Sequence, residues 1–275
     1  MTVSELGAGP DEDLEDGCQA TTSDGDNLVL DYARAEAAAF GDMTTAAGGR
    51  LLDDDEAGLH LRDMGVGTPF GNVAMLTRPI ADADTPAVIQ RLRSFYDGHP
   101  GGPFLVFSPW RTTDWSAAGF VRVGHPPLMF RPVGEARTSA DGLRVVPVAD
   151  EDALADFERT LIEAYPTPEM QPWQRGSMLA PGILDSHWRF FVGYEGDEAV
   201  ATAAGYVSPA VTLVELVSTR PEVRGRGYGA ALTAAASVVA PDQPAMLIAS
   251  DDGRGVYDGL GYLPLQRHTL WLGLR

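Results

Sequence analysis

A glycine-rich turn between an apolar run and an alanine-rich run holds the residues best suited to bind a ligand. Residues 211–217 are apolar and largely β-branched, which predicts a strand. Pro221 ends this run, and glycines follow at positions 225, 227 and 229 before an alanine-rich stretch, 230–240, that predicts a helix. A strand, a glycine turn and a helix start direct several backbone N–H groups and the positive end of a helix dipole at an anion.

The distribution of positive charge supports an anion site at this turn. Between Arg189 and Arg254 the basic residues are Arg220, Arg224 and Arg226, which all lie in the turn, although the chain has a net charge of −19. We therefore interpret the turn as a cradle for a pyrophosphate.

The rest of the sequence narrows the class of phosphate ligand. A P-loop and a kinase site each require a lysine, and the chain contains none. Residues 225–230 fit the loose dinucleotide pattern G-x-G-x-x-A, but a Rossmann half also needs further βα units and an acidic residue about 20 positions on. The 45 residues after Ala230 are too few for these units and a substrate domain. Coenzyme A is the remaining candidate.

Two segments resemble signatures of the GNAT N-acetyltransferase superfamily. Residues 224–229, Arg-Gly-Arg-Gly-Tyr-Gly, are similar to its [QR]-x-x-G-x-[GA] motif, which holds the pyrophosphate of acetyl-CoA. Residues 250–262 are similar to its second signature, a short helix that carries a tyrosine and is followed by Leu-Gly-[Phe/Tyr]. The two come in the family's order, and the resemblance covers about residues 143–275.

The resemblance implies an α/β (α+β) fold with a mixed, mostly antiparallel GNAT-type sheet flanked by helices. Residues 115–120 echo residues 257–262, because in both an aromatic residue lies four positions before a glycine–aromatic pair. We interpret this echo as two tandem GNAT-like units, of which the N-terminal one has lost cofactor binding; a chance similarity is the alternative.

Composition sets the expected domain boundaries. Residues 1–26 contain eight acidic residues and no basic one, which predicts a flexible acidic tail. Prolines and glycines interrupt the apolar pattern between positions 131 and 142. We expect an N-terminal GNAT-like domain without a cofactor motif at 27–132, a linker at 133–142 and an acetyl-CoA-binding domain at 143–275.

The resemblance also assigns the cofactor contacts. The N–H groups of residues 225–230 would bind the pyrophosphate, with charge added by Arg224 and Arg226. A splayed strand would line the pantetheine arm, and a strand N–H near Val217 would meet the thioester carbonyl. Ser250 stands where many members carry an asparagine that contacts the pantetheine, so this sequence departs from the family there. The expected cofactor-binding residues are Leu216, Val217, Ser218, Thr219, Arg224, Gly225, Arg226, Gly227, Tyr228, Gly229, Ala230 and Ser250.

Two residues are candidates for proton transfer. Tyr257 matches the family tyrosine that protonates the departing thiolate, and the alternative is a packed core aromatic. Glu215 is the one acidic residue on the strand before the cradle. It would act as a general base through water, since a glutamate with an ordinary pKa of about 4.3 is too weak for direct deprotonation. The alternative for Glu215 is a structural or surface carboxylate.

The expected function is transfer of an acetyl group from acetyl-CoA to a primary amine by direct attack on the thioester. The acceptor would be a small-molecule amine or a peptide N-terminus. The alternative is a non-catalytic tandem protein that binds acyl-CoA as a scaffold or sensor.

Composition limits the other partners. With 39 acidic residues against 20 arginines, neither nucleic acid nor an anionic membrane is expected to bind. The sequence shows no transmembrane run and no secretion signal, and Cys18 is the single cysteine, so a cytoplasmic location is expected. The five histidines lack ligand spacing, and no metal is assigned. Residues 53–56 are interpreted as a solvated turn, with a metal site as the alternative. The oligomeric state is not indicated.

Overall fold

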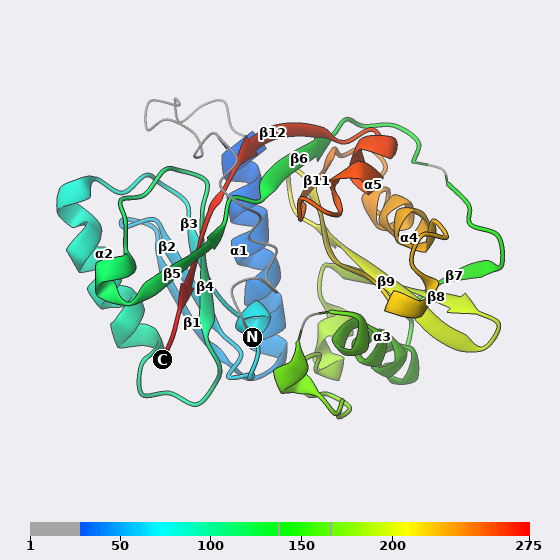
Figure 1. Ribbon diagram of the computed structural model, residues 1–275, viewed down its shortest axis with the longest axis horizontal. Coiled ribbons are helices and arrows are strands. Elements are labelled where there is room, and N and C mark those ends of the chain that lie inside the picture. Colours follow the sequence, from blue (N-terminus) through cyan, green and yellow to red (C-terminus); the bar gives the residue numbers. More distant parts are fainter. Residues whose placement is uncertain (1–27, 137, 166) are drawn as a thin grey trace. The chain divides into compact units, whose positions relative to one another are not determined.

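The computed structural model describes residues 28–136, 138–165 and 167–275, so the expected acidic tail lies outside the described residues (Figure 1). The described chain divides into two units. Unit 1 runs up to Leu128 and takes in Leu265–Arg275 as well, and unit 2 comprises Met129–Pro264. The structure thus groups the last eleven residues with the N-terminal part of the chain, whereas the sequence placed them in the C-terminal domain.

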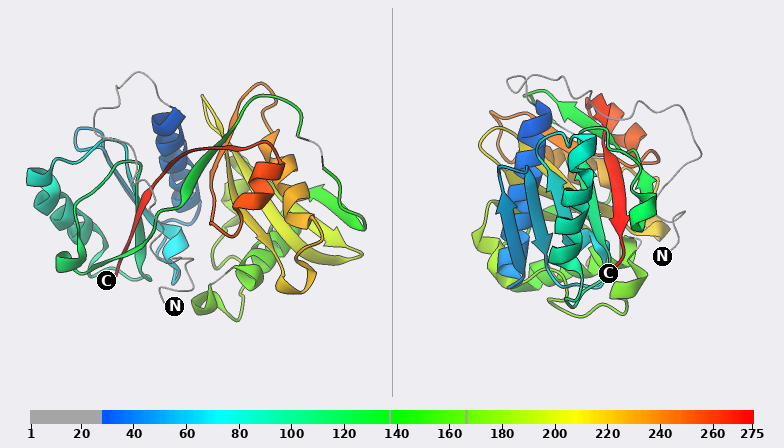
Figure 2. Two further views of the ribbon diagram at one scale, coloured as in Figure 1. Left: turned by 45° about the horizontal axis from the view of Figure 1, so that its top comes forward. Right: turned by 90° about the vertical axis from the view of Figure 1, so that its left-hand side faces the viewer.

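Unit 1 is a sheet with a helix on each face. Along β3 the Met75 side chain points to one face of the sheet, and those of Ala74 and Leu76 point to the opposite face. Ala37 of α1 packs with Met75, and Leu92 of α2 packs with Ala74 and Leu76. Figure 2 shows α2 lying over this sheet and running along its strands in its right-hand view. The strand order is β1-β2-β3-β4-β13-β5. The elements are α1 (Leu28–Ala46), β1 (Arg50–Asp54), β2 (Leu59–Asp63), β3 (Asn72–Leu76), α2 (Thr85–Tyr96), β4 (Phe104–Ser108), β5 (Phe120–Gly124) and β13 (Thr269–Gly273).

Unit 2 holds the glycine turn and has seven strands in the order β12-β6-β11-β10-β9-β8-β7. Helices α3 and α4 lie on opposite sides of β8, β9 and β10 (Figure 1). Strands β6 and β12 stand where the chain passes between the units. The elements are β6 (Pro127–Arg131), β7 (Leu143–Pro147), α3 (Glu151–Ala164), β8 (Trp188–Glu195), β9 (Glu198–Val207), β10 (Thr212–Thr219), α4 (Tyr228–Ser237), β11 (Ala245–Ile248), α5 (Arg254–Gly259) and β12 (Leu263–Arg267).

The two halves of the chain repeat one order of elements. In the N-terminal half the order is α1-β1-β2-β3-α2-β4, a short 3₁₀ helix (Ser116–Ala118), β5 and β6. In the C-terminal half the order is α3-β8-β9-β10-α4-β11-α5-β12-β13, so that α5 takes the place of the 3₁₀ helix. The final strand of each series is exchanged: β13 lies between β4 and β5, and β6 lies between β11 and β12. The expectation of two GNAT-like units is therefore confirmed, and the strand exchange explains why residues 265–275 belong to unit 1.

The acidic segment 53–56 is partly ordered into a strand, so its interpretation as a solvated turn was wrong for its first half. Asp53 and Asp54 end β1. The Asp53 carboxylate accepts a hydrogen bond from Arg62 at 2.6 Å, and Asp54 pairs with Arg91 at 2.6 Å. Within the described residues, no group of three or more His, Cys, Asp or Glu side chains could hold a metal ion.

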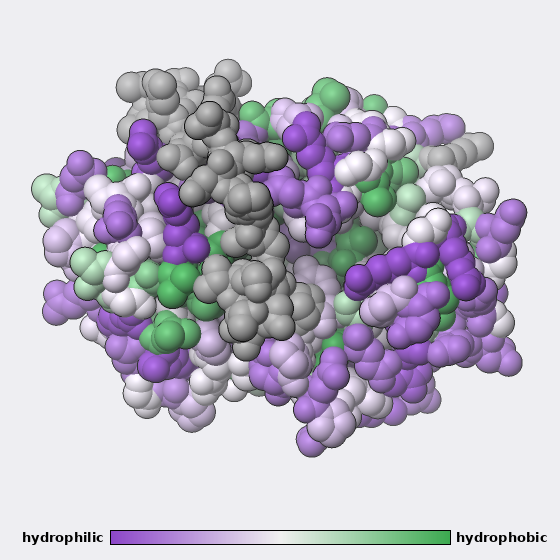
Figure 3. Space-filling model, in the orientation of Figure 1, coloured by the Kyte–Doolittle hydropathy of each residue, from purple (hydrophilic) through white to green (hydrophobic). Residues whose placement is uncertain are grey.

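Hydrophilic residues predominate on the face of the molecule shown in Figure 3. Of the helices that the structure describes, none combines the length and the apolar character needed to cross a membrane.

A buried histidine should make unit 1 sensitive to acid. His268 is fully buried beside the Tyr32 ring, with ring centroids 5.5 Å apart, and burial lowers the pKa of its imidazole to about 3 from 6.5. Between these two values the unfolded chain binds a proton that the folded unit does not. The free energy of unfolding should therefore fall as the pH falls from 6.5, by up to about 1.4 kcal/mol per pH unit for this one group.

The measurement is urea unfolding between pH 4 and pH 7. The change His268→Phe should make the urea midpoint less dependent on pH, and His99→Phe at an exposed site is the control for the loss of a histidine. Parallel curves for the wild type and His268→Phe would contradict a neutral buried imidazole.

Candidate active site

Strand β10 opens away from β11 in the middle of the sheet of unit 2. The two strands are parallel and pair at Thr212 with Ala245 and at Leu213 with Met246. Beyond this point β10 continues to Thr219 and stays paired with β9 on its other side. The backbone of residues 216–219, which were expected to line a pantetheine arm, therefore lies along the opened side of β10.

The same part of β10 contains a β-bulge. Its register with β9 runs to Glu215 opposite Ala204 and resumes at Ser218 opposite Thr202, so that Leu216 and Val217 face one residue of β9. Leu216 has a φ of +56°, the left-handed region that a leucine rarely adopts. The bulge thus changes the direction of the backbone at the residues expected to meet the thioester.

The glycine turn leads directly from β10 into α4. Gly225 and Gly227 have φ values of +80° and +81°, which explains the need for glycine at both positions. Gly227 is the N-cap of α4, and no side chain caps this helix. A β-carbon on Gly229 would lie 3.3 Å from the Thr219 Oγ1, so glycine lets the helix start approach the end of β10. The first turn of α4 therefore presents backbone N–H groups without a side-chain cap.

The other residues of the turn differ in their exposure. The Tyr228 side chain is 3% exposed and packs in the core of unit 2, and it also interacts with the Arg226 side chain of the turn. Ala230 is half-buried in the first turn of α4.

The three arginines of the turn are already engaged. Arg224 donates to the Thr219 and Ala164 carbonyls, at 3.0 and 3.2 Å, and so ties the turn to the end of α3. Arg226 pairs with Glu195 at 2.8 Å. Much of the positive charge that the sequence indicated is therefore balanced locally, because Arg220 and Arg226 both pair with acidic residues.

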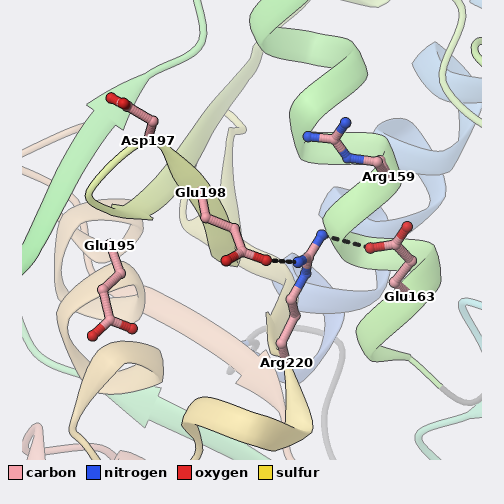
Figure 4. A pocket seen from close by; sticks show the side chains of 6 residues that line it. All are labelled: Arg159, Glu163, Glu195, Asp197, Glu198 and Arg220. Carbon is pink, nitrogen blue, oxygen red and sulfur yellow. Dashed lines mark hydrogen bonds and ion pairs between the residues drawn. The ribbon is translucent and has the colours of Figure 1, made fainter.

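Arg220 belongs to an open pocket beside the turn, shown in Figure 4. It lies between Glu163 of α3 and Glu198 of β9 and donates to both carboxylates at 2.5 Å. The pocket has a volume of about 710 Å³ and carries a formal charge of −2, because two arginines face four acidic residues. Its lining residues are Arg159, Glu163, Glu195, Asp197, Glu198 and Arg220.

Tyr257 is held on α5 by the turn that follows β11. The Ser250 hydroxyl accepts a hydrogen bond from the Gly253 N–H at 3.1 Å, and the Ser250 backbone carbonyl accepts one from the Arg254 N–H at 3.0 Å. Ser250 is exposed and acts in the structure as a cap for this turn. A β-carbon on Gly253 would lie 3.5 Å from the Tyr257 ring, which shows how closely the turn passes the ring.

Glu215 and two phenols share one electrostatic environment. Burial raises the pKa of Tyr257 above its usual value, and the charges of Tyr165 and Glu215 raise it further. Burial, followed by Glu215, also raises the pKa of Tyr165 to about 12. The two expected catalytic residues thus lie close enough to interact electrostatically, and Tyr165 lies near them. Sequence reasoning did not single out Tyr165, because nothing in its local pattern relates residue 165 to strand β10.

A buried carboxylate orders the irregular segment after α3. Glu158 is 1% exposed and accepts four hydrogen bonds from this segment. The donors are the Trp173 Nε1 at 3.0 Å and the N–H groups of Gly176, Met178 and Leu179 at 2.7, 2.6 and 2.9 Å. The sequence signal for this contact is the position of Glu158, an acidic residue on the face of the predicted helix that otherwise carries Leu154, Phe157 and Leu161.

Comparison with known proteins agrees with this geometry. Residues 151–262 match the model of the acetyltransferase (GNAT) family, a segment that runs from α3 through the glycine turn to Tyr262. This part of the chain is a GNAT domain. No curated protein matches the chain in sequence.

Solved structures resemble the protein over most of its length. A GCN5-related N-acetyltransferase from Kribbella flavida superposes with a TM-score of 0.65 at 20% identity and covers 90% of this chain and 95% of its own. A functionally unknown conserved protein from Staphylococcus epidermidis gives a TM-score of 0.60 at 15% identity, covering 82% of this chain and 94% of its own. At these identities the likeness shows the fold.

Proposed function

We propose that unit 2 transfers an acetyl group from acetyl-CoA to a primary amine, either a small molecule or a peptide N-terminus. One observation carries this proposal: β10 opens from β11 directly before a glycine turn that leads into a helix without a side-chain cap. An edge of backbone that β11 leaves unpaired, next to a row of N–H groups, suits a ligand that has an amide-containing arm and a pyrophosphate.

The residues of the opening fit acetyl-CoA. The N–H groups of residues 225–230 would hold the pyrophosphate, and residues 216–219 would pair with the arm. The N–H groups would also work without the charges of Arg220 and Arg226, which the structure pairs with acidic residues. The Ser250 hydroxyl accepts from Gly253 and keeps its own proton to donate to the arm.

Two residues would move protons. The acceptor amine must lose a proton to become a nucleophile, and Glu215 would take it through a water molecule. When the C–S bond breaks, electrons move to the sulfur, and Tyr257 would give its phenolic proton to that sulfur. The burial that raises the pKa of Tyr257 would also raise the pKa of a thiol in the same place, so the two groups would shift in the same direction.

The proposal is tested by the release of CoA. Wild-type protein with acetyl-CoA should release free CoA thiol when supplied with one class in a panel of aliphatic amines, amino acids and short peptides, and the product should carry the acetyl group by mass spectrometry. Tight binding of acetyl-CoA without release for any amine would favour a non-catalytic binder. An absence of binding would overturn both functions.

Unit 1 lacks the features that make the site in unit 2. The turn between β3 and α2 has no glycine, and it carries Asp82 and Asp84, whose charges would repel a phosphate at the start of α2. Strands β3 and β4 stay paired as far as Met75 opposite Phe107, and β2 pairs with β3 in unbroken register.

We therefore expect one acetyl-CoA per chain. Isothermal titration calorimetry of the wild-type protein should give a stoichiometry close to one, and the change Asp84→Asn in unit 1 should leave it unaltered. A second bound molecule per chain would show that unit 1 keeps a cofactor site.

A further inference from the structure

The bulge in β10 is held from the neighbouring strand by a buried hydroxyl. The Thr202 side chain on β9 is fully buried, and its Oγ1 donates to the Leu216 carbonyl at 2.8 Å. The same Oγ1 lies 2.7 Å from the Ser218 Oγ. Both contacts reach β10 at the bulge, where the regular ladder between the two strands is interrupted.

The protons of this network can be assigned. A carbonyl oxygen only accepts, so the single proton of the Thr202 hydroxyl is directed to the Leu216 carbonyl. The Ser218 hydroxyl must then donate to the Thr202 Oγ1. Thr202 is therefore saturated as a donor, and Ser218, which is 7% exposed, is held in one orientation.

The bulge needs such support for two reasons. Leu216 is, over the described parts of the chain, the one non-glycine residue with a positive φ, a conformation that costs an L-residue roughly 1–2 kcal/mol. In addition, β11 no longer pairs with β10 beyond Leu213, so the network on the β9 side is the available restraint at this point.

We propose that Thr202, with Ser218, is a positioning pair that fixes the backbone of Leu216 and Val217 for the reaction. Fixed N–H donors aimed at a developing oxyanion are worth more than mobile ones, since they need no reorganisation when the charge forms. The inference rests on the proposed acyl transfer, because it assigns a function to the bulge within that site.

The test compares two buried threonines that each donate to a backbone carbonyl. Thr202→Val removes the hydroxyl at the bulge with little change in volume. Thr160→Val is the matched control, since Thr160 on α3 is also fully buried and donates to the Ala199 carbonyl at 3.4 Å. Thr202→Ser restores a hydroxyl and serves as the rescue.

Activity should separate the variants. Thr202→Val should lower kcat about 10- to 100-fold, which is part of the 10²- to 10³-fold loss seen when an oxyanion donor is removed outright. Its Kd for acetyl-CoA should change by less than about threefold, a difference below 1 kcal/mol. Thr160→Val and Thr202→Ser should keep kcat near the wild-type value. Equal kcat values for Thr202→Val and Thr160→Val would overturn the proposal.

Hydrogen exchange gives a readout that does not depend on turnover. Amides of residues 212–219 should exchange about tenfold faster or more in Thr202→Val, because losing the donor to a buried carbonyl costs an amount comparable to a tenfold change in an opening equilibrium. Thr160→Val should leave these amides unchanged. Unchanged exchange in Thr202→Val would also overturn the proposal. Faster exchange in a protein that acetylates no amine would instead show that Thr202 restrains the bulge while the proposed function, and with it the role in catalysis, is wrong.

Discussion

Replacing Tyr257 by phenylalanine is expected to lower kcat about 10²- to 10⁴-fold, the usual contribution of a positioned general acid. The phenol is protonated at neutral pH, since its ordinary pKa is about 10 and its surroundings raise it further. Phenylalanine keeps the ring and removes only the proton donor, so the Kd for acetyl-CoA and the thermal stability should stay close to the wild type.

Tyr262 provides a matched control for this variant. It lies in the same motif, and its ring is 6.0 Å from that of Tyr257. Its hydroxyl is bonded to the Ser237 Oγ at 2.7 Å in the core. Tyr262→Phe should therefore cost some stability and keep kcat. Steady-state kinetics with calorimetry on both variants separates the effects. Full turnover in Tyr257→Phe would mean that Tyr257 is only a packed aromatic.

A glutamate at position 227 is expected to abolish measurable binding of acetyl-CoA. Gly227 is the N-cap of α4, and the space around its backbone is open apart from Ala140, 3.8 Å from a β-carbon placed there. A carboxylate here would face the pyrophosphate. Two like charges about 4 Å apart near a protein surface repel by about 4 kcal/mol, so the affinity should fall at least about 100-fold.

Two controls separate charge from strain. Any side chain at position 227 is strained by the φ of +81°, so Gly227→Gln reports strain and bulk without the charge. Gly48→Glu places a glutamate at another left-handed glycine, with φ +68° and open space, in unit 1. Calorimetry should show the largest loss for Gly227→Glu, a smaller one for Gly227→Gln and none for Gly48→Glu. Unchanged affinity in a folded Gly227→Glu protein would show that the turn does not bind the pyrophosphate.

Several elements could be predicted closely because they depend on short-range patterns. The pattern of residues 85–96 predicts a helix, and these residues form α2. Leu154, Phe157 and Leu161 share one face of a predicted helix, and they are buried on α3. Hydrogen bonds and side-chain faces within a helix repeat over three or four residues, so the sequence of one segment is enough to indicate them.

Some residues of the candidate site could likewise be predicted from the local sequence, and others could not. Glycines 225 and 227 were recognisable because a left-handed backbone strongly favours glycine. The contributions of Tyr165 and Thr202 were not recognisable, because each acts on a segment far away in the sequence, and Glu158 could be noticed only as an acidic residue on an apolar helix face. Arg224 and Arg226 were interpreted as charge for the pyrophosphate, but Arg226 pairs with Glu195 of another element. The roles of the site residues remain predictions.

The sequence by itself determined the family signatures, the glycine turn and the helix that follows it. Only the tertiary structure decided where β6 and β13 lie, since each joins the sheet of the other half of the chain. It also decided the bulge at Leu216, which depends on the register with β9 and on a threonine of that strand. Strand pairing and register are set by contacts between distant segments, and a strand's own pattern indicates which faces are buried but not which neighbour it pairs with.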